Sequence, residues 1–220
     1  AFAALKDDGS VITWGNSSNG ADSSSVSHQL SSGVTQIFST RQSFAALTDD
    51  GAVVTWGDGS AANASTVAPS LTSGVSQIFT TPDAFAALKD DGSVITWGNY
   101  GGDSSSVSAD LSSGVVQITS NERSFAALKD DGSVVTWGGF AIGADSAALS
   151  SGVSQISATG AVFAALKDDG SVIVWGHSSP DYGGDISSVS DQLMSGVSQI
   201  FSNRHSFAAL KDDGSVITWG

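Results

Sequence analysis

Aspartate is the residue type through which this sequence could do acid–base chemistry. The chain has 22 acidic residues, and 21 of them are Asp. Twelve of these stand as Asp-Asp pairs, each followed by Gly, in six copies of one short motif. A general acid and a general base need two carboxylates in different environments, whereas equal copies in every repeat belong to the repeat itself. We therefore interpret the pairs as turn residues and predict no catalytic residue among them.

A second group of Asp has the residue type that suits a calcium ion. These residues follow Gly-Ala or Gly-Gly in the loops between repeats: Asp22, Asp103, Asp145 and Asp185. Calcium binds six to eight oxygen atoms, and each loop offers one carboxylate with Ser hydroxyls and backbone carbonyls beside it. The same residues are common formers of Asx turns. We predict no metal site and no cofactor, and keep these four residues as the calcium candidates.

Other catalytic patterns are missing from the sequence. His28, His177 and His205 occupy different places in their repeats, without His or Cys at zinc-ligand spacing. No Gly-x-Ser-x-Gly elbow follows a strand, and the absence of cysteine excludes thiolate nucleophiles and disulfides. We therefore expect a protein that is not an enzyme.

The elements that would position these residues recur along the chain. The block FAALKDDGSVITWG stands unchanged at Phe2–Gly15, Phe85–Gly98 and Phe207–Gly220, and close variants begin at Phe44, Phe125 and Phe163. Two short runs rich in aliphatic and β-branched residues flank Asp-Asp-Gly, which predicts a β-hairpin. A type I turn over the two Asp, with the Gly at positive φ, would close the hairpin because Gly has no Cβ.

One tryptophan ends each predicted hairpin. The six residues are 42, 41, 40, 38 and 44 positions apart: Trp14, Trp56, Trp97, Trp137, Trp175 and Trp219. A spacing of about 40 residues is typical of one propeller blade. Because the same aromatic residue stands at a fixed place in every repeat, we predict that it packs in the core between neighbouring blades.

A further strand signal, Gly-Val-x-Gln-Ile, precedes every hairpin except the first. Its five copies cover Val34–Ile37, Val75–Ile78, Val115–Ile118, Val153–Ile156 and Val197–Ile200. The sequence thus predicts an all-β fold, a β-propeller or propeller-like array with six hairpins and five inner strands. We expect one tandem-repeat domain over residues 1–220, as a segment of a longer array or with the missing strand supplied by another chain.

The order of these motifs resembles the repeat of the regulator of chromosome condensation family. The motifs are Gly-Val-x-Gln-Ile, a variable loop, Phe-Ala-Ala-Leu, Asp-Asp-Gly and Trp-Gly, followed by a Gly-rich loop at Asn16–Gly20. The short period and the Ser-Gly-Val before each inner strand are similar to the propeller-type secreted β-lactamase inhibitors. The resemblance implies a propeller, of seven blades in those relatives.

The resemblance implies that, in the inhibitors, aromatic residues of the loop before the hairpin dock the partner enzyme. The matching candidate positions here are Arg41, Gln42, Pro82, Asp83, Glu122, Arg123, Arg204 and His205, with Gly160 and Ala161 in the fourth such loop. None of them is aromatic. The chromosomal family uses a basic surface and an inserted wedge, whereas this chain is acidic and has no comparable insertion.

The charge balance limits the class of partner. A net charge of −14 repels phosphate backbones and anionic lipid headgroups, and no apolar run is long enough to insert into a membrane. We therefore expect protein partners or self-assembly, without nucleic acid or membrane insertion. Near-identical repeats favour an extracellular or cell-surface scaffold with a structural or adhesive role. The alternative is a soluble protein-binding propeller that uses the variable loops of one face.

Overall fold

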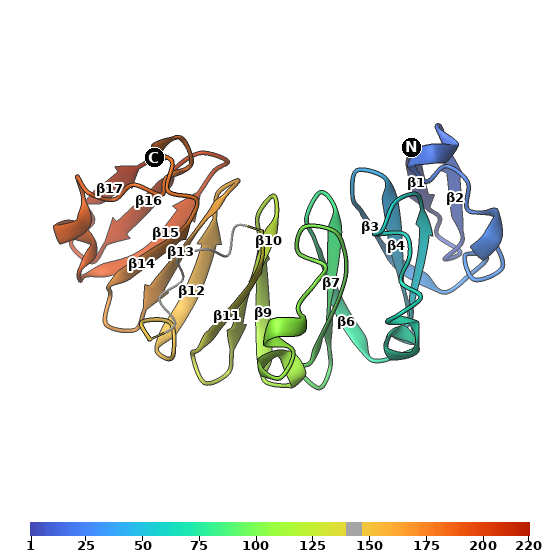
Figure 1. Cartoon of the computed structure of the whole chain (residues 1–220), viewed down its shortest axis with the longest axis horizontal. Helices are drawn as coiled ribbons and strands as arrows, with labels where there is room; N and C mark the ends of the chain where they lie inside the picture. Colours follow the sequence, from blue (N-terminus) through green and yellow to red (C-terminus); the bar gives the residue numbers. More distant parts are fainter. Residues whose placement is uncertain (140–146) are drawn as a thin grey trace. The chain divides into compact units, whose positions relative to one another are not determined.

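The computed structural model describes residues 1–139 and 147–220, and over these residues the protein consists of β-strands, turns and short 3-10 helices (Figure 1). The chain divides into two compact units, Ala1–Ser113 and Gly114–Gly220. Within each unit, successive antiparallel sheets follow one another along the chain. This is the propeller-type blade arrangement that the repeats predict.

The first unit contains one two-stranded sheet and two three-stranded sheets. Its strands are β1 (Phe2–Leu5), β2 (Val11–Trp14), β3 (Val34–Ser39), β4 (Ser43–Thr48), β5 (Val53–Gly57), β6 (Val75–Thr80), β7 (Ala84–Lys89) and β8 (Val94–Gly98). The second unit contains three three-stranded sheets. Its strands are β9 (Val115–Ser120), β10 (Ser124–Lys129), β11 (Val134–Gly138), β12 (Val153–Ala158), β13 (Val162–Lys167), β14 (Val172–Gly176), β15 (Val197–Ser202), β16 (Phe207–Lys211) and β17 (Val216–Trp219).

The Phe-Ala-Ala-Leu strand lies in the middle of each three-stranded sheet. In the β3–β4–β5 sheet, Ile37 of β3 and Val54 of β5 both pair with Ala46 of β4. A register shift between Val34 and Gln36 marks a β-bulge on the first strand, and the other four sheets have the equivalent shift. The first sheet has only the β1–β2 hairpin, as the strand count predicts.

The Asp-Asp-Gly segments close the hairpins as predicted. In the first, the Gly9 N–H donates to the Lys6 carbonyl at 2.9 Å, and Gly9 has φ = 76°. Asp8 Oδ1 accepts hydrogen bonds from the Ser10 N–H at 3.0 Å and the Ser10 hydroxyl at 2.6 Å. The other five turn glycines also have positive φ, between 75° and 82°. The pattern is a type I turn followed by a left-handed Gly.

The same turns join each sheet to the next within a unit. The Val34 N–H of β3 donates to the Gly9 carbonyl at 3.0 Å, and the Asp49 N–H donates to the Gly33 carbonyl at 2.8 Å. A Cβ on Gly9 would lie 2.7 Å from the Gly33 nitrogen. The close approach of two backbones explains why Gly stands at both places.

A stacked Phe–Trp pair forms the centre of each repeat. The ring centroids of Phe85 and Trp97 are 5.1 Å apart, and these side chains are 0% and 3% exposed. The indole N–H groups of Trp56 and Trp97 donate to carbonyls of the preceding repeat, those of Gly20 and Ala61. The structure also buries the tryptophans Trp137, Trp175 and Trp219.

Trp14 does not follow the core prediction. It stacks on Phe2 with centroids 5.6 Å apart, but the two side chains are 50% and 64% exposed. The prediction of a buried indole is wrong here, because within the described residues no other repeat packs over this face of the β1–β2 hairpin. Burial of the Phe–Trp pair therefore depends on the neighbouring repeat.

The connections between repeats are pinned by one leucine each. These residues are 2% exposed: Leu30, Leu71, Leu111, Leu149 and Leu193. The described connections also contain short 3-10 helices: η1 (Ser17–Asn19), η2 (Ser24–Val26), η3 (Ala68–Leu71), η4 (Ser105–Val107), η5 (Asp110–Ser112), η6 (Pro180–Tyr182) and η7 (Ser190–Leu193). Burial of these leucines fixes the Ser/Gly-rich connections to the sheets. Over the described residues, none of the helices has the length and apolarity needed to cross a membrane.

Candidate functional site

The variable loops between the first and second strands of each three-stranded sheet, which we name the AB loops, have a common internal frame. They are Thr40–Ser43, Thr81–Ala84, Asn121–Ser124, Thr159–Val162 and Asn203–Ser206. In each, the first N–H donates to the carbonyl of the fourth residue at 2.9–3.0 Å. The side chain of the first residue accepts a second bond, as when Asn203 Oδ1 receives the N–H groups of His205 and Ser206. The Thr or Asn at this place is a signal that the sequence analysis did not use.

One backbone hydrogen bond and one ion pair join the two AB loops of the first unit. The Arg41 N–H donates to the Pro82 carbonyl at 2.9 Å. Arg41 Nη1 lies 2.7 Å from Asp83 Oδ2, and the Gln42 carbonyl accepts the Asp58 N–H. Pro82 has no N–H and takes part only as an acceptor. Four predicted binding residues, Arg41, Gln42, Pro82 and Asp83, are therefore brought together.

The three AB loops of the second unit are joined in the same way. The Glu122 N–H donates to the Gly160 carbonyl at 3.0 Å, and the Gly160 N–H donates to the Arg204 carbonyl at 2.8 Å. Arg204 Nη2 then lies 2.9 Å from Glu122 Oε1, so this ion pair passes over the middle loop. A Cβ on Gly160 would lie 3.2 Å from Glu122 Oε1. Glycine at position 160 thus leaves room for the pair.

Aromatic side chains from the connections extend this surface. Tyr182 stacks on His205 with ring centroids 5.9 Å apart, and the His177 ring meets Tyr182 edge-on at 6.0 Å. His205 Nδ1 lies 3.3 Å from the Asp181 carbonyl oxygen. In the first unit, the Asn99 N–H donates to the Asp83 carbonyl, which places the neighbouring Tyr100, 60% exposed, beside the AB loops. The sequence analysis missed both tyrosines because they lie in connections that vary in length.

Arg123 completes the set of predicted loop residues. Its N–H donates to Asn121 Oδ1 at 2.9 Å, and its carbonyl accepts the Gly139 N–H at 2.9 Å. The AB loop is therefore fixed at this residue from both sides.

The opposite ends of the hairpins carry the lysines. Lys6 pairs with Asp8 at 3.1 Å. Lys89, Lys167 and Lys211 instead donate to backbone carbonyls of the preceding connections, with Lys89 Nζ 3.1 Å from the Ser70 oxygen. The lysine ammonium groups at this end therefore bind mainly to other groups of the chain itself.

The calcium candidates that the structure describes form Asx turns, in which the carboxylate accepts the N–H two residues later. Oδ1 of Asp22 accepts the Ser24 N–H at 3.0 Å, and Asp103 and Asp185 accept equivalent bonds from Ser105 and Ser187. Bonds from the Ser24 hydroxyl and N–H hold the pKa of Asp22 below its usual value. Asp145 lies outside the described residues. Within residues 1–139 and 147–220, no three His, Cys, Asp or Glu side chains gather closely enough to hold a metal ion.

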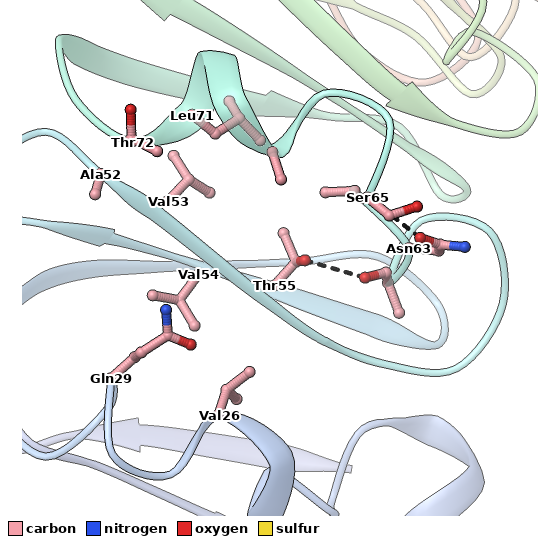
Figure 2. Close-up of a pocket in the computed structure, with 13 residues that line it drawn as sticks. Val26, Gln29, Ala52, Val53, Val54, Thr55, Asn63, Ser65, Leu71 and Thr72 are labelled. Carbon is pink, nitrogen blue, oxygen red and sulfur yellow. Dashed lines mark hydrogen bonds between the residues drawn. The ribbon is translucent and has the colours of Figure 1, made fainter.

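A shallow groove of about 470 Å³ runs beside β5 in the first unit (Figure 2). Val53 and Leu71 line one side, and Val26 and Gln29 line the other. The Thr55 hydroxyl donates to the Ala62 carbonyl at 3.0 Å across its floor. The groove has no ionisable lining residue, so it offers no group for acid–base chemistry.

The fold is shared with proteins of known structure, whereas no protein-family model and no curated protein matches the chain. Yeast RCC1 (Prp20) bound to Kap60 is 16% identical and has a TM-score of 0.51, over 84% of this chain and 55% of that one. Human WBSCR16 is 20% identical with a TM-score of 0.49, over 85% and 61% of the two chains. The CRINKLY WD40 ectodomain of the Arabidopsis thaliana receptor kinase ACR4 is 15% identical with a TM-score of 0.45, over 99% and 77%.

The likeness to yeast RCC1 shows the class of fold. The chain is similar to RCC1 in having an RCC1-type repeat fold of propeller blades. It spans 55% and 61% of the lengths of RCC1 and WBSCR16.

Proposed function

We propose that this chain is a non-enzymatic propeller that binds a protein partner through its AB loops. The proposal rests on the positions of the residue types that are common in binding hot spots. All three arginines of the sequence stand in AB loops: Arg41, Arg123 and Arg204. Tyr100 and Tyr182, the two tyrosines, lie beside these loops. Arginine and tyrosine are enriched among residues that dominate protein binding.

The loops are also fixed before binding. The main-chain bonds from Glu122 to Gly160 and from Gly160 to Arg204 restrain the three loops of the second unit. A surface that is already ordered loses less conformational entropy when a partner binds. Variable residues on a rigid frame are how many binding surfaces are built. Yeast RCC1, which is similar in fold, is bound to the protein Kap60 in its crystal structure.

The test compares loop variants with a surface control. Affinity capture from the source organism, read by quantitative mass spectrometry, is run with the unaltered chain and with Arg204→Ala, Tyr182→Ala and Met194→Ala variants. Met194 is 70% exposed and lies in a connection, so it serves as the control. We expect a partner that the first two variants lose and the control keeps. A partner set unchanged by either loop variant would refute the role of the loops.

The finer likeness to the β-lactamase inhibitors supplies one partner class for a direct assay. Inhibition of a β-lactamase by the purified chain would support it. The AB loops contribute Arg, His and acidic side chains where the inhibitors have aromatic ones, so we expect no inhibition.

A second candidate function is an extracellular or cell-surface scaffold that self-assembles. The observation in its favour is exposed apolar side chains on the first and last sheets. Phe2, Ile12 and Trp14 are 64%, 54% and 50% exposed, and Phe201 and Val216 are 50% and 61% exposed. Light scattering over a range of concentrations should then show association that an Ile12→Ser variant weakens, and antibody labelling of intact cells should reach the protein. A mass independent of concentration would exclude this role.

A further inference from the structure

The sequence contains seven Asp-Gly steps, which share a known chemical weakness. They are Asp8-Gly9, Asp50-Gly51, Asp58-Gly59, Asp91-Gly92, Asp131-Gly132, Asp169-Gly170 and Asp213-Gly214. The backbone nitrogen after an Asp can attack the side-chain carboxyl carbon and close a five-membered ring. Glycine allows this because no Cβ hinders the approach and the backbone adopts many conformations. Whether a given step reacts depends on the geometry that the fold imposes.

Six of these steps lie in hairpin turns that hold both reacting groups. The turn glycine N–H donates to the carbonyl of the residue three positions earlier in all six, at 2.9–3.0 Å. The carboxylate turns forward and binds the N–H two residues later, as when Asp91 Oδ1 accepts the Ser93 N–H at 2.9 Å and its hydroxyl at 2.6 Å. In these six turns the Gly nitrogen and the Asp carboxyl group are therefore hydrogen-bonded to other groups and not to each other.

Asp58-Gly59 has a different arrangement. It follows the end of β5, and here the Gly59 N–H donates to Asp58 Oδ1 itself at 2.7 Å. The nitrogen that would attack thus points at the carboxyl group of the preceding side chain. Both residues are exposed, so water can reach the ring that would form.

We propose that Asp58 is the site of this chain at which aspartate converts to isoaspartate. The Gly59 nitrogen forms a bond to Asp58 Cγ and loses its proton, while the carboxyl group loses its hydroxyl, so that one water molecule leaves and a succinimide forms. Water then opens the ring at either carbonyl. Opening at Cγ restores aspartate, and opening at the main-chain carbonyl gives isoaspartate, in which the backbone passes through Cβ. No oxidant, reductant or cofactor takes part.

Protonation also affects how fast the turn steps react. The protonated carboxyl group is the better electrophile, because its hydroxyl leaves more readily than an oxide. Hydrogen bonds from Ser93 hold the pKa of Asp91 below its usual value, and those from Ser10 lower the pKa of Asp8 to about 2. The turn carboxyl groups are therefore ionised over a wider range of pH, which further slows their reaction.

The modification would change the AB-loop surface of the first unit. The Asp58 N–H donates to the Gln42 carbonyl at 2.9 Å, and the Ser43 hydroxyl donates to the Asp58 carbonyl at 2.6 Å. Isoaspartate places an extra methylene in the backbone between these two bonds. They cannot both keep their lengths, so the AB loop must shift.

The experiment incubates the intact chain in mildly acidic buffer made with ¹⁸O-water and maps its peptides by mass spectrometry. Ring opening incorporates one heavy oxygen, and isoaspartate is separated from aspartate by chromatography. We expect label and isoaspartate to accumulate at Asp58 several-fold faster than at any of the six turn sites. Deamidation at Asn19-Gly20 is distinguished because it also converts an amide to an acid.

Two controls make the result decisive. An Asp58→Glu variant should lose the signal at this position, since the longer side chain would need a six-membered ring. The same chain in concentrated urea should react at all seven steps at similar rates, because the turns no longer protect them. Equal reaction at the seven steps in the folded chain, or a folded chain that reacts at the turns and not at Asp58, would overturn the proposal.

Discussion

The same 14-residue sequence occurs at Phe2–Gly15 and Phe85–Gly98, and the first unit contains both copies. Each forms the same hairpin and the same stacked Phe–Trp pair, with centroids 5.6 and 5.1 Å apart. The exposed fractions differ greatly, because Trp14 is 50% exposed and Trp97 is 3% exposed. Only the second copy packs against a preceding repeat. Local sequence therefore determines the hairpin, and the neighbouring repeat determines whether its aromatic pair becomes core.

The largest expected effect tests this difference directly. Trp97→Ala removes a buried ring and the bond from its indole N–H to the Ala61 carbonyl, and we expect it to lower the free energy of unfolding by about 3–5 kcal/mol. The matched variant Trp14→Ala removes a half-exposed ring, with an expected loss of about 1 kcal/mol. Urea denaturation followed by circular dichroism measures both. Equal losses would mean that the neighbouring repeat contributes little to the core.

The turn glycines allow a second comparison between identical blocks. Gly9 and Gly214 both have positive φ, 76° and 82°. A Cβ on Gly9 would lie 2.7 Å from the Gly33 nitrogen, whereas nothing lies within 4 Å of a Cβ on Gly214. Left-handed strain should cost both Ala variants about 1–2 kcal/mol.

Gly9→Ala should lose more than Gly214→Ala, by about 1 kcal/mol, because the bond from the Val34 N–H to the Gly9 carbonyl is also disturbed. Thermal unfolding of the two variants and the parent chain measures the difference. If Gly214→Ala were the more damaging, contact between successive turns would not be what stabilises them.

A smaller difference in stability loss is expected between two copies of the Val-Ser-Gln-Ile strand. Gln155 Nε2 donates to the Ile200 carbonyl at 2.6 Å, and Gln155 Oε1 accepts the Ile200 N–H at 3.1 Å, which ties β12 to β15. Gln199 in the last sheet is exposed. We expect Gln155→Ala to cost about 1–2 kcal/mol, and Gln199→Ala to change stability by about 0.5 kcal/mol or less. Hydrogen exchange of the Ile200 amide, faster only in the first variant, provides a second readout.

The sequence predicts the features that each repeat builds from its own residues. Hairpins, positive φ at the turn glycines, and the pairing of the Val-x-Gln-Ile strand with Phe-Ala-Ala-Leu are all observed, because turn chemistry and residue alternation are local. The exposure of Trp14 was not predicted, since it depends on a neighbour and not on the hairpin.

The candidate site also has features that the sequence predicts and features that depend on neighbouring repeats. Its AB-loop positions could be found from their variation between repeats. The ion pair from Glu122 to Arg204 joins residues 82 positions apart in sequence, and the Tyr182–His205 stack depends on the path of a connection of unusual length. The only sequence signal for either contact was Gly160. This glycine looks like an ordinary loop residue when the positions of the neighbouring loops are unknown.

The smallest expected effect concerns a property that should not depend on neighbours. Hydrogen bonds from the Ser10 hydroxyl and N–H, together with Lys6, lower the pKa of Asp8 from 3.8 to about 2. Those from Ser93 lower the pKa of Asp91, and the Ser hydroxyl to Asp Oδ1 distance is 2.6 Å in both turns. Ser10→Ala and Ser93→Ala should therefore raise the pKa of the adjacent Asp by similar amounts, which NMR titration of the carboxyl carbons measures.

The sign of the pH effect follows from these directions. Because the pKa of Asp8 is lower in the folded chain than the ordinary 3.8, the ionised carboxylate stabilises the fold above pH 3.8, and this contribution is lost as the pH falls from 3.8 to about 2. Ser10→Ala should make the stability of the chain less dependent on pH across that window and leave the dependence above it unchanged. A clearly larger pKa change in the Asp91 turn than in the Asp8 turn would show that neighbouring repeats also tune these carboxylates. The separation between local turns and neighbour-dependent core would then no longer hold.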